Sequence, residues 1–260
     1  MRDYTANIFR DLSETIKDSG YKTYTVYSYY LSMIKNDIAD RYFILRHDVD
    51  ANPRNALRMA LIENKFNLQS TYYFRIAKSN ISPPDIISEI ASMGHEIGYH
   101  YEHLSDAKGD IQKAKVIFED NLKKLRSLCD VKTVCMHGRP FSKYDGRDFW
   151  KHYKLEDFNL VSEPYLTINY KDKYYFSDTG HVWNNARFNI RDIVVSKGNF
   201  EIDKTQDLMR LIREKKIDKA MFLTHTDNWV DNIPLWLFYK TFFSILNFVK
   251  RFLKIILNAK

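Results

Sequence analysis

The stretch "YFILRHDVDANP" (42–53) joins an apolar run to a group of polar side chains. The run is typical of a buried strand, and Asp48 and Asp50 follow it directly. Asn52 and Pro53 are typical of an N-cap and a first helical position, so we expect a helix to begin there. In parallel α/β proteins functional groups lie at the carboxyl ends of the strands, which is where these acids fall.

Similar apolar runs recur along the chain. The expected strands are 42–46, 70–76, 95–100, 132–137, 158–163, 174–178 and 220–225. The expected helices are 52–66, 83–93, 108–128 and 205–215. Strands that alternate with helices indicate an α/β fold with a largely parallel sheet, open or closed into a barrel.

Four of the expected strands are followed at once by side chains that could act as ligands or bases. These residues are Asp48, Asp50, His100, His103, His137 and His225. Because the carboxyl ends of parallel strands meet at one rim, we expect these side chains to gather in one site.

The two aspartates of "RHDVD" are two residues apart, so a continuing strand would place both on one side. Adjacent carboxylates repel each other, and a bound cation on one of them relieves the repulsion. Alternatively, Asp50 only caps the helix that follows.

The segment "GHEIGYHYEH" (94–103) supplies two further candidate ligands. On a helical turn, the His-x-x-His spacing of His100 and His103 would place both rings on one side, which suits zinc or a similar divalent ion. This spacing is a weak signal alone, and it gains weight beside Asp48 and Asp50.

Three later segments offer residues that could bind a substrate. His137 ends a strand, and the turn after it could aim Arg139 at a carboxylate or a substrate anion, unless it is an ordinary loop arginine. Asp178, Trp183 and Trp229 suit a sugar site, because aromatic faces stack on sugar rings, although Trp183 could equally be a packed anchor.

In "MFLTHTDNW" (221–229), His225 ends a strand near Asp227. A carboxylate that orients an imidazole and supports its protonated form makes His225 a candidate general acid. A structural histidine is the alternative.

The 260 residues, 45% of them hydrophobic, suffice for one large domain. A net charge of +7 suits an anionic partner, but no nucleic-acid-binding motif is present, so we expect no nucleic acid. The spacing of the two cysteines indicates neither a disulfide nor a zinc knuckle. The charged first twenty residues lack the apolar core of a signal peptide, and we therefore expect a cytoplasmic protein.

The end of the chain, 235–260, has 17 apolar residues, five basic residues and no acid. Its polar positions recur every three or four residues, which predicts an amphipathic helix. We expect a barrel over 1–232 and this helix over 233–260. The basic stripe favours contact with the inner face of a membrane through 234–260. Packing on the barrel or against a second subunit is the alternative, and the oligomeric state stays open.

The segments "LRHDVD", "GHEIGYHYE", "HGRP", "SDTG" and "LTHTDNW" occur in this order. As an ordered set they resemble the polysaccharide deacetylase superfamily, of the NodB-like or carbohydrate esterase family 4 type, in its divergent surface-glycan branch. The resemblance covers about residues 20 to 230. It implies a distorted (β/α) barrel that uses a divalent metal to remove acetyl groups from N- or O-acetylated sugars.

The resemblance also implies roles for particular residues. Asp48 would be the catalytic base and Asp50 a metal ligand. His100 would be a second ligand with His103 as its partner, and His225 would be the general acid.

Two departures from the family pattern concern the metal. The usual adjacent pair of aspartates is here separated by Val49, and Leu104 stands where the second histidine is usual. The third ligand is therefore open between His103, Glu102 and His137.

Together, residues and resemblance predict a metal-dependent deacetylase of surface polysaccharide biosynthesis. Zinc is the expected ion, and the substrate is an acetylated sugar, nucleotide-linked or lipid-linked. The alternative is a catalytically silent barrel that binds glycans or acts as a membrane-associated scaffold.

Overall fold

The computed structural model describes residues 2–76, 82–139, 142–183, 194–198 and 200–258, with side chains up to residue 249. Its strands are β1 (Lys22–Tyr24), β2 (Tyr42–Val49), β3 (Thr71–Arg75), β4 (Glu96–Tyr101), β5 (Val134–Met136), β6 (Tyr174–Ser177) and β7 (Lys219–His225). They form one sheet in the order β5-β4-β3-β2-β7-β6, with β1 beside β2. Every pair of neighbouring strands is parallel, as the alternation in the sequence predicts.

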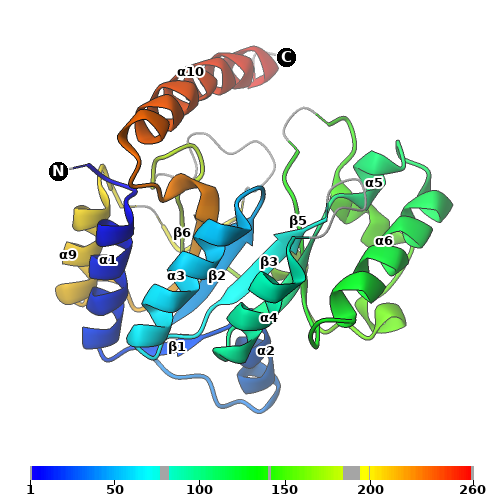
Figure 1. Cartoon of the computed structure of the whole chain (residues 1–260), viewed down its shortest axis with the longest axis horizontal. Coiled ribbons are helices and arrows are strands. Elements are labelled where there is room, and N and C mark those ends of the chain that lie inside the picture. The colour runs from blue at the N-terminus through cyan, green and yellow to red at the C-terminus, as the bar shows by residue number, and fades with distance from the viewer. Residues whose placement is uncertain (1, 77–81, 140–141, 184–193, 199, 259–260) are drawn as a thin grey trace.

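Helices surround this sheet. They are α1 (Ala6–Asp18), α2 (Val26–Ile34), α3 (Pro53–Lys65), α4 (Pro84–Ser92), α5 (His103–Asp106), α6 (Ile111–Arg126), α7 (Pro164–Thr167), α9 (Thr205–Arg213) and α10 (Ile233–Asn258). Three 3₁₀ turns are η1 (Gly146–Lys151), η2 (Leu155–Phe158) and η3 (Thr226–Asn228). Figure 1 shows α9, α1, α3 and α4 side by side along one side of the sheet, and each contacts the next.

The sheet curls so that its two ends face a common interior. Cys135 on β5 and Tyr175 on β6 belong to one buried cluster with Tyr73 and Met221 from the strands between them. Within the described part of the chain β5 and β6 do not pair with each other, so the barrel stays open on that side. The predicted α/β class with a distorted barrel is confirmed.

Side chains of β2 alternate between the interior and the surrounding helices. Ile44 packs inside the barrel, and Leu45 packs outside it, in the cluster that includes α1 and α9. With a period of two, Arg46 and Asp48 face the interior and His47 faces α3. The whole strand is buried.

The helix after β2 begins as the sequence predicts. The side chain of Asn52 accepts a hydrogen bond from the backbone N–H of Asn55 at 3.1 Å, and Pro53 occupies the first turn. The predicted strand 158–163 is wrong. Part of it lies in η2, and Ser162 forms a single bridge with Thr133. A short strand cannot be told from an apolar loop by hydrophobicity alone.

The predicted C-terminal amphipathic helix is α10, which lies over the rest of the molecule (Figure 1). Within the described residues, no helix is both long enough and apolar enough to cross a membrane. The division into 1–232 and 233–260 stays a prediction.

Candidate metal centre

The parallel register brings the polar strand ends together. Asp48 on β2 is paired with His225 on β7, and His100 on β4 is paired with Cys135 on β5. Two residues beyond Cys135, on the same side of the chain, His137 follows the end of β5. Neighbouring strands thus deliver two carboxylates and three imidazoles to one rim.

Three of these side chains form a group that could hold a metal ion. Potential ligand atoms of Asp50, His100 and His137 all lie within 4.8 Å of one another. Asp50 Oδ1 is 3.5 Å from His100 Nε2 and 3.7 Å from His137 Nε2. That oxygen is buried and has no hydrogen-bond partner among the described residues. A buried carboxylate oxygen beside two imidazoles fits a divalent cation.

His100 is oriented for this purpose by the backbone. Its Nδ1 lies 3.0 Å from the carbonyl oxygen of Cys135 and must donate, since a carbonyl only accepts. Nε2 of the neutral ring therefore carries a free lone pair toward Asp50. Burial lowers the pKa of His100 to about 4, so the ring is neutral at physiological pH.

A carboxylate orients His137 in the same way. Its Nδ1 lies 2.9 Å from Glu102 Oε2. Arg75 holds Glu102 through two hydrogen bonds of 2.9 and 3.0 Å, and Arg139 Nε lies 3.0 Å from it. Burial would raise the pKa of Glu102, but His137 and Arg75 together lower it to about 2. An ionised Glu102 fixes the His137 tautomer that leaves Nε2 free for a ligand.

Asp48 lies next to this group as half of a buried ion pair. Arg46 donates to it twice, from Nε at 2.9 Å and from Nη2 at 2.7 Å. The guanidinium lies 5.3 Å from the ring centre of Tyr73 and 5.0 Å from that of Tyr165. Burial alone would raise the pKa of Asp48, but Arg46 holds it well below the usual range. Asp48 is therefore ionised and held firmly by Arg46.

His225 lies across from Asp48 with a carboxylate behind it. Asp178 Oδ1 is 2.7 Å from His225 Nδ1, and Asp178 Oδ2 accepts from Trp229 Nε1 at 2.9 Å. Burial alone would lower the pKa of His225, but Asp178, with smaller contributions from Asp50 and Asp48, raises it to about 10. The imidazolium is thus the stable form at neutral pH, which suits a proton donor.

The structure does not bring His103 to the other candidate ligands. It begins α5 and is fully buried, with its ring 4.3 Å from that of Phe149 and 4.8 Å from that of Phe118. Burial lowers its pKa to about 3. Contrary to the expected partnership of His100 and His103, the group that could hold a metal contains His137, one of the three residues between which the third ligand was open. The reason is that β4 continues through Tyr101 and no helical turn links His100 to His103.

Four expected substrate-binding residues have other surroundings. Asp178 is fully buried beneath His225, so it positions that ring. Trp183 and Trp229 are both buried, and each packs against Tyr4, so neither offers a face to a sugar. Arg139 binds the protein's own carboxylates, as one of its sequence alternatives foresaw.

A pocket opens beside His137. It measures about 460 Å³ and is lined by Ser105, His137, Gly138, Arg139, Ser142, Lys143 and Tyr144. Hydroxyl groups and one aromatic ring next to the candidate ligands suit a polar organic molecule.

Sequence reasoning missed two arginines of the site. Arg46 could have been found, because it lies two residues before Asp48 on the same face of a strand. Arg75 carries no such signal, since its partner Glu102 belongs to a different strand end.

No protein-family model and no curated protein matches the sequence. The solved structures similar to the chain include the Streptococcus pyogenes deacetylase PplD in complex with acetate, at 14% identity over 54% of this chain and 67% of that chain, with a TM-score of 0.41. They also include the Xyl-CE4 domain of a multidomain xylanase from the hindgut metagenome of Trinervitermes trinervoides, at 13% identity over 76% and 82%, with a TM-score of 0.39. The likeness concerns the fold.

Proposed function

We propose that this protein is a metal-dependent hydrolase that removes an acetyl group from an N- or O-acetylated sugar of a surface polysaccharide. The observation that carries the proposal is the position of Asp50, His100 and His137 beside an ionised Asp48 and a protonated His225. Ligand group, base and acid are the three parts that metal-assisted hydrolysis needs.

Zinc is the ion we propose for this group. Two imidazole nitrogens and one carboxylate oxygen are a donor set that catalytic zinc uses, with a further position left open. When bound, the cation would lower the pKa of a water molecule and polarise the acetyl carbonyl.

The protein's own side chains would move the protons. Asp48 would accept a proton from the attacking water, and its two bonds to Arg46 keep it in place. His225 would donate a proton to the departing amine or alkoxide. Asp178 would steady that ring before and after the transfer.

We place the sugar in the pocket beside His137. Its lining includes the hydroxyl groups of Ser105 and Ser142, which lie 2.9 Å apart, and the ring of Tyr144, with Lys143 Nζ 5.0 Å from the ring centre. These groups suit the hydroxyls and the flat face of a pyranose.

The experiment is a screen for acetate release from free, nucleotide-linked and lipid-linked acetylated sugars, with zinc, cobalt or manganese supplied. We expect one bound divalent ion per chain and metal-dependent acetate release from one substrate class. Asp48→Asn should keep the metal and lose about a hundredfold or more in rate.

The matched control is Asp130→Asn, the same change at an exposed site in the loop before β5. A purified chain that takes up no divalent ion would overturn the proposal and favour a silent glycan-binding barrel.

A further inference from the structure

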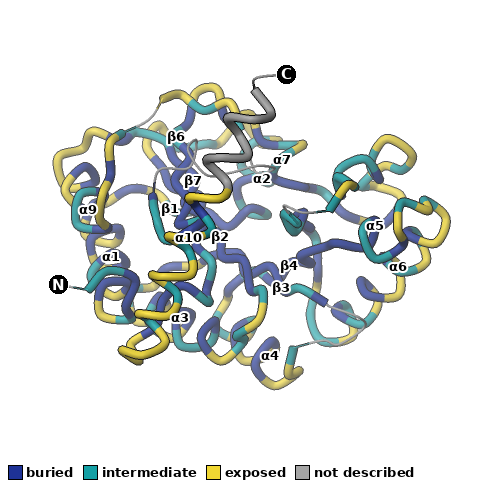
Figure 2. The backbone as a smooth tube through the Cα atoms, turned by 90° about the horizontal axis from the view of Figure 1, so that it is seen from above, coloured by how far each residue is buried: buried dark blue, intermediate teal, exposed yellow. Residues whose placement is uncertain are grey.

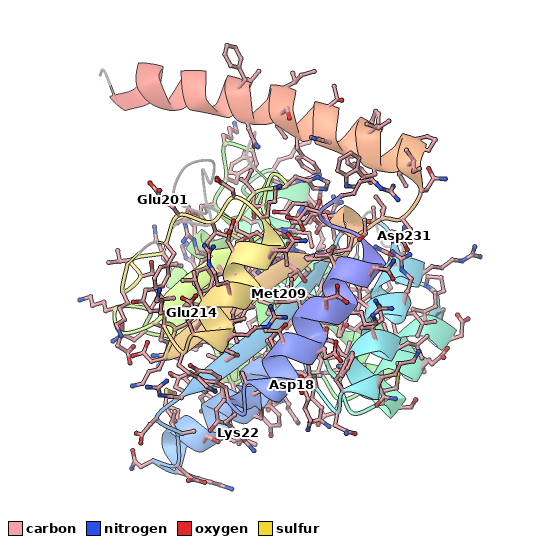
Figure 3. All side chains as sticks on the ribbon, turned by 90° about the vertical axis from the view of Figure 1, so that its left-hand side faces the viewer. Asp18, Lys22, Glu201, Met209, Glu214 and Asp231 are labelled. Atoms are coloured by element: carbon pink, nitrogen blue, oxygen red, sulfur yellow. The ribbon has the colours of Figure 1, made fainter. Side chains whose placement is uncertain are left out.

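Helix α10 is fixed to the barrel along one side. The indole N–H of Trp236 donates to the backbone oxygen of Asp3 at 2.7 Å, and the Asn247 amide donates to that of Gly180 at 2.8 Å. Between them the ring of Phe243 stacks on His181 at 5.0 Å. Figure 3 shows the helix above the body, with Asp231 near its start. These contacts define which side of α10 faces inward.

The other side of α10 is apolar and exposed. Its exposed apolar side chains are Ile233, Leu235, Leu237, Phe238, Phe242, Ile245, Phe248 and Val249. Phe238 is 60% and Phe248 is 73% exposed, and Figure 2 colours most residues in this part of α10 as exposed. Within the described part of the chain nothing covers these rings. A continuous apolar face of this kind marks an interaction surface.

The positive charge of residues 233–260 favours one kind of partner for this apolar surface. From 233 to 260 the chain has no acid and five basic residues, which are Lys240, Lys250, Arg251, Lys254 and Lys260. Two copies packed through this surface would bring together two segments that both carry an excess of positive charge, which is unfavourable. An anionic lipid surface accepts the apolar side chains and complements the positive charge.

We propose that α10 lies in the headgroup region of an anionic membrane, with its exposed apolar side chains among the lipids. Each basic residue near such a surface strengthens binding by about fivefold, and each buried aromatic ring adds to this. Its inward side stays fixed to the barrel through Trp236, Phe243 and Asn247.

The docked helix would also place the candidate metal centre near the lipid surface. Gly180 and His181 lie two and three residues after Asp178, which holds His225. The ring of Tyr239 on α10 lies 6.2 Å from that of His181, so this helix runs close to the segment after Asp178. Burial, and to a smaller degree the negative charge of Asp227 in η3, raises the pKa of Tyr239. Asp227 also accepts from the backbone N–H of Ala51, next to Asp50.

The closeness of the candidate metal centre to the lipid surface points to one class of substrate. Resting on the proposed function, we infer that the acetylated sugar is attached to a membrane-anchored carrier and reaches the rim from the lipid side. A soluble acetylated sugar would be a poorer substrate than the same sugar on a lipid carrier in vesicles.

The test of docking is co-sedimentation of the full chain with vesicles of phosphatidylglycerol and phosphatidylcholine, compared with phosphatidylcholine alone. We expect binding to the anionic vesicles that weakens with salt. Phe238→Ser/Phe248→Ser should weaken it by about tenfold or more. Lys250→Gln/Lys254→Gln should weaken it by about twentyfold.

The matched control is Leu61→Ser/Val116→Ser, which removes exposed apolar side chains from α3 and α6. Absence of binding to anionic vesicles, or equal loss in this control, would overturn the docking. So would a wild-type dimer in gel filtration that Phe238→Ser/Phe248→Ser converts to a monomer, because a second copy would then cover the surface.

Docking and catalysis fail separately in this design. Vesicle binding is measured without substrate or added metal, so it can succeed in a chain with no hydrolase activity. Conversely, the wild type could fail to bind vesicles while Phe238→Ser/Phe248→Ser releases acetate from a soluble sugar at an unchanged rate. This result would overturn the docking and leave the hydrolase proposal standing. Equal rates on soluble and vesicle-borne sugar would overturn only the inference that the sugar is attached to a membrane-anchored carrier.

Discussion

The two faces of β2 carry two buried polar clusters, and their difference is instructive. On the outer face, Glu63 of α3 accepts hydrogen bonds from His47 at 3.0 Å, from Ser70 at 2.6 Å and from Tyr72 at 2.8 Å. The other nitrogen of His47 bonds to Thr224. Each group of this outer cluster has its partner within the protein.

On the inner face the cluster is incomplete. Arg46 satisfies Asp48, but Asp50 Oδ1 is buried without a hydrogen bond among the described residues, and the free nitrogens of His100 and His137 point toward it. A complete cluster stabilises the fold, whereas an incomplete one is arranged around something that is added later. Variants in the two clusters should therefore fail in different ways.

The largest effect is expected at Asp50. Asp50→Ala should abolish stoichiometric metal binding and lower acetate release by about a thousandfold, because one of three ligands is lost. Thermal stability without metal should stay unchanged, since a buried oxygen without a partner is removed. Metal analysis and calorimetry check both points, with Asp130→Ala as the control. Retained metal would show that Asp50 is no ligand.

Glu63→Ala should do the opposite: it should lower the stability of the fold and leave metal binding unchanged. The loss of the carboxylate leaves His47, Ser70 and Tyr72 buried without their partner, at a cost of about 3–5 kcal/mol in the free energy of unfolding. Metal stoichiometry at low temperature should be unchanged. Denaturant unfolding measures the cost, and Glu63→Gln, which keeps the side-chain shape, should show a smaller one. Loss of metal with unchanged stability would contradict the assignment of the outer cluster to structure.

Asp178→Asn should move the alkaline limit of activity. The raised pKa of His225, about 10, keeps this candidate general acid protonated up to that pH, and without Asp178 the pKa falls toward its ordinary value near 6.5. At pH 8.5 the rate should drop about a hundredfold, while at pH 6 it should change little. The pH profile of kcat is the measurement. An alkaline limb that does not move would exclude His225 as the acid.

The ion pair of His225 and Asp178 also makes the free energy of unfolding depend on pH. Because the folded pKa of His225 is raised, its contribution is complete below the unfolded value of about 6.5 and is lost as the pH rises through about 10. The Asp178→Asn variant should therefore lose stability mainly at low and neutral pH, as thermal melts at pH 6 and pH 10.5 would show.

The smallest effect is expected at His103. His103→Phe places an aromatic ring among aromatic rings and removes two nitrogens that lack partners among the described residues, so the melting temperature should hold or rise. Metal content should not change, whereas His137→Phe should lose the metal. Metal loss in His103→Phe would restore it as the third ligand.

The sequence predicted the fold class because its signal is periodic and repeated. The apolar run at 42–46, the cap at Asn52 and the acids at the carboxyl end of β2 appear in the structure where they were expected. Asp48, Asp50, His100 and His225 were identified for one physical reason. They lie at the carboxyl ends of parallel strands, and those ends meet.

The choice of the third candidate ligand among His103, Glu102 and His137 was out of reach of local reasoning. A spacing of three places two residues together only on a helix, and β4 is still extended at His100 and Tyr101. His137 reaches the group because β5 lies beside β4 with Cys135 opposite His100, and a single sequence does not show which strands are neighbours. The buried positions of Trp183 and Trp229 likewise depend on contacts with Tyr4, which is far away in the sequence.

The alternation along β2 has a consequence for how the chain folds. A shift of one residue in the pairing of this strand would turn His47 into the barrel and press the Arg46–Asp48 pair against α3, which would leave the buried Glu63 without His47 as its partner. The shift would therefore destabilise the packing on both faces of β2. The polar residues of the candidate site and those of the outer cluster thus both favour the native register of β2 over a shifted one.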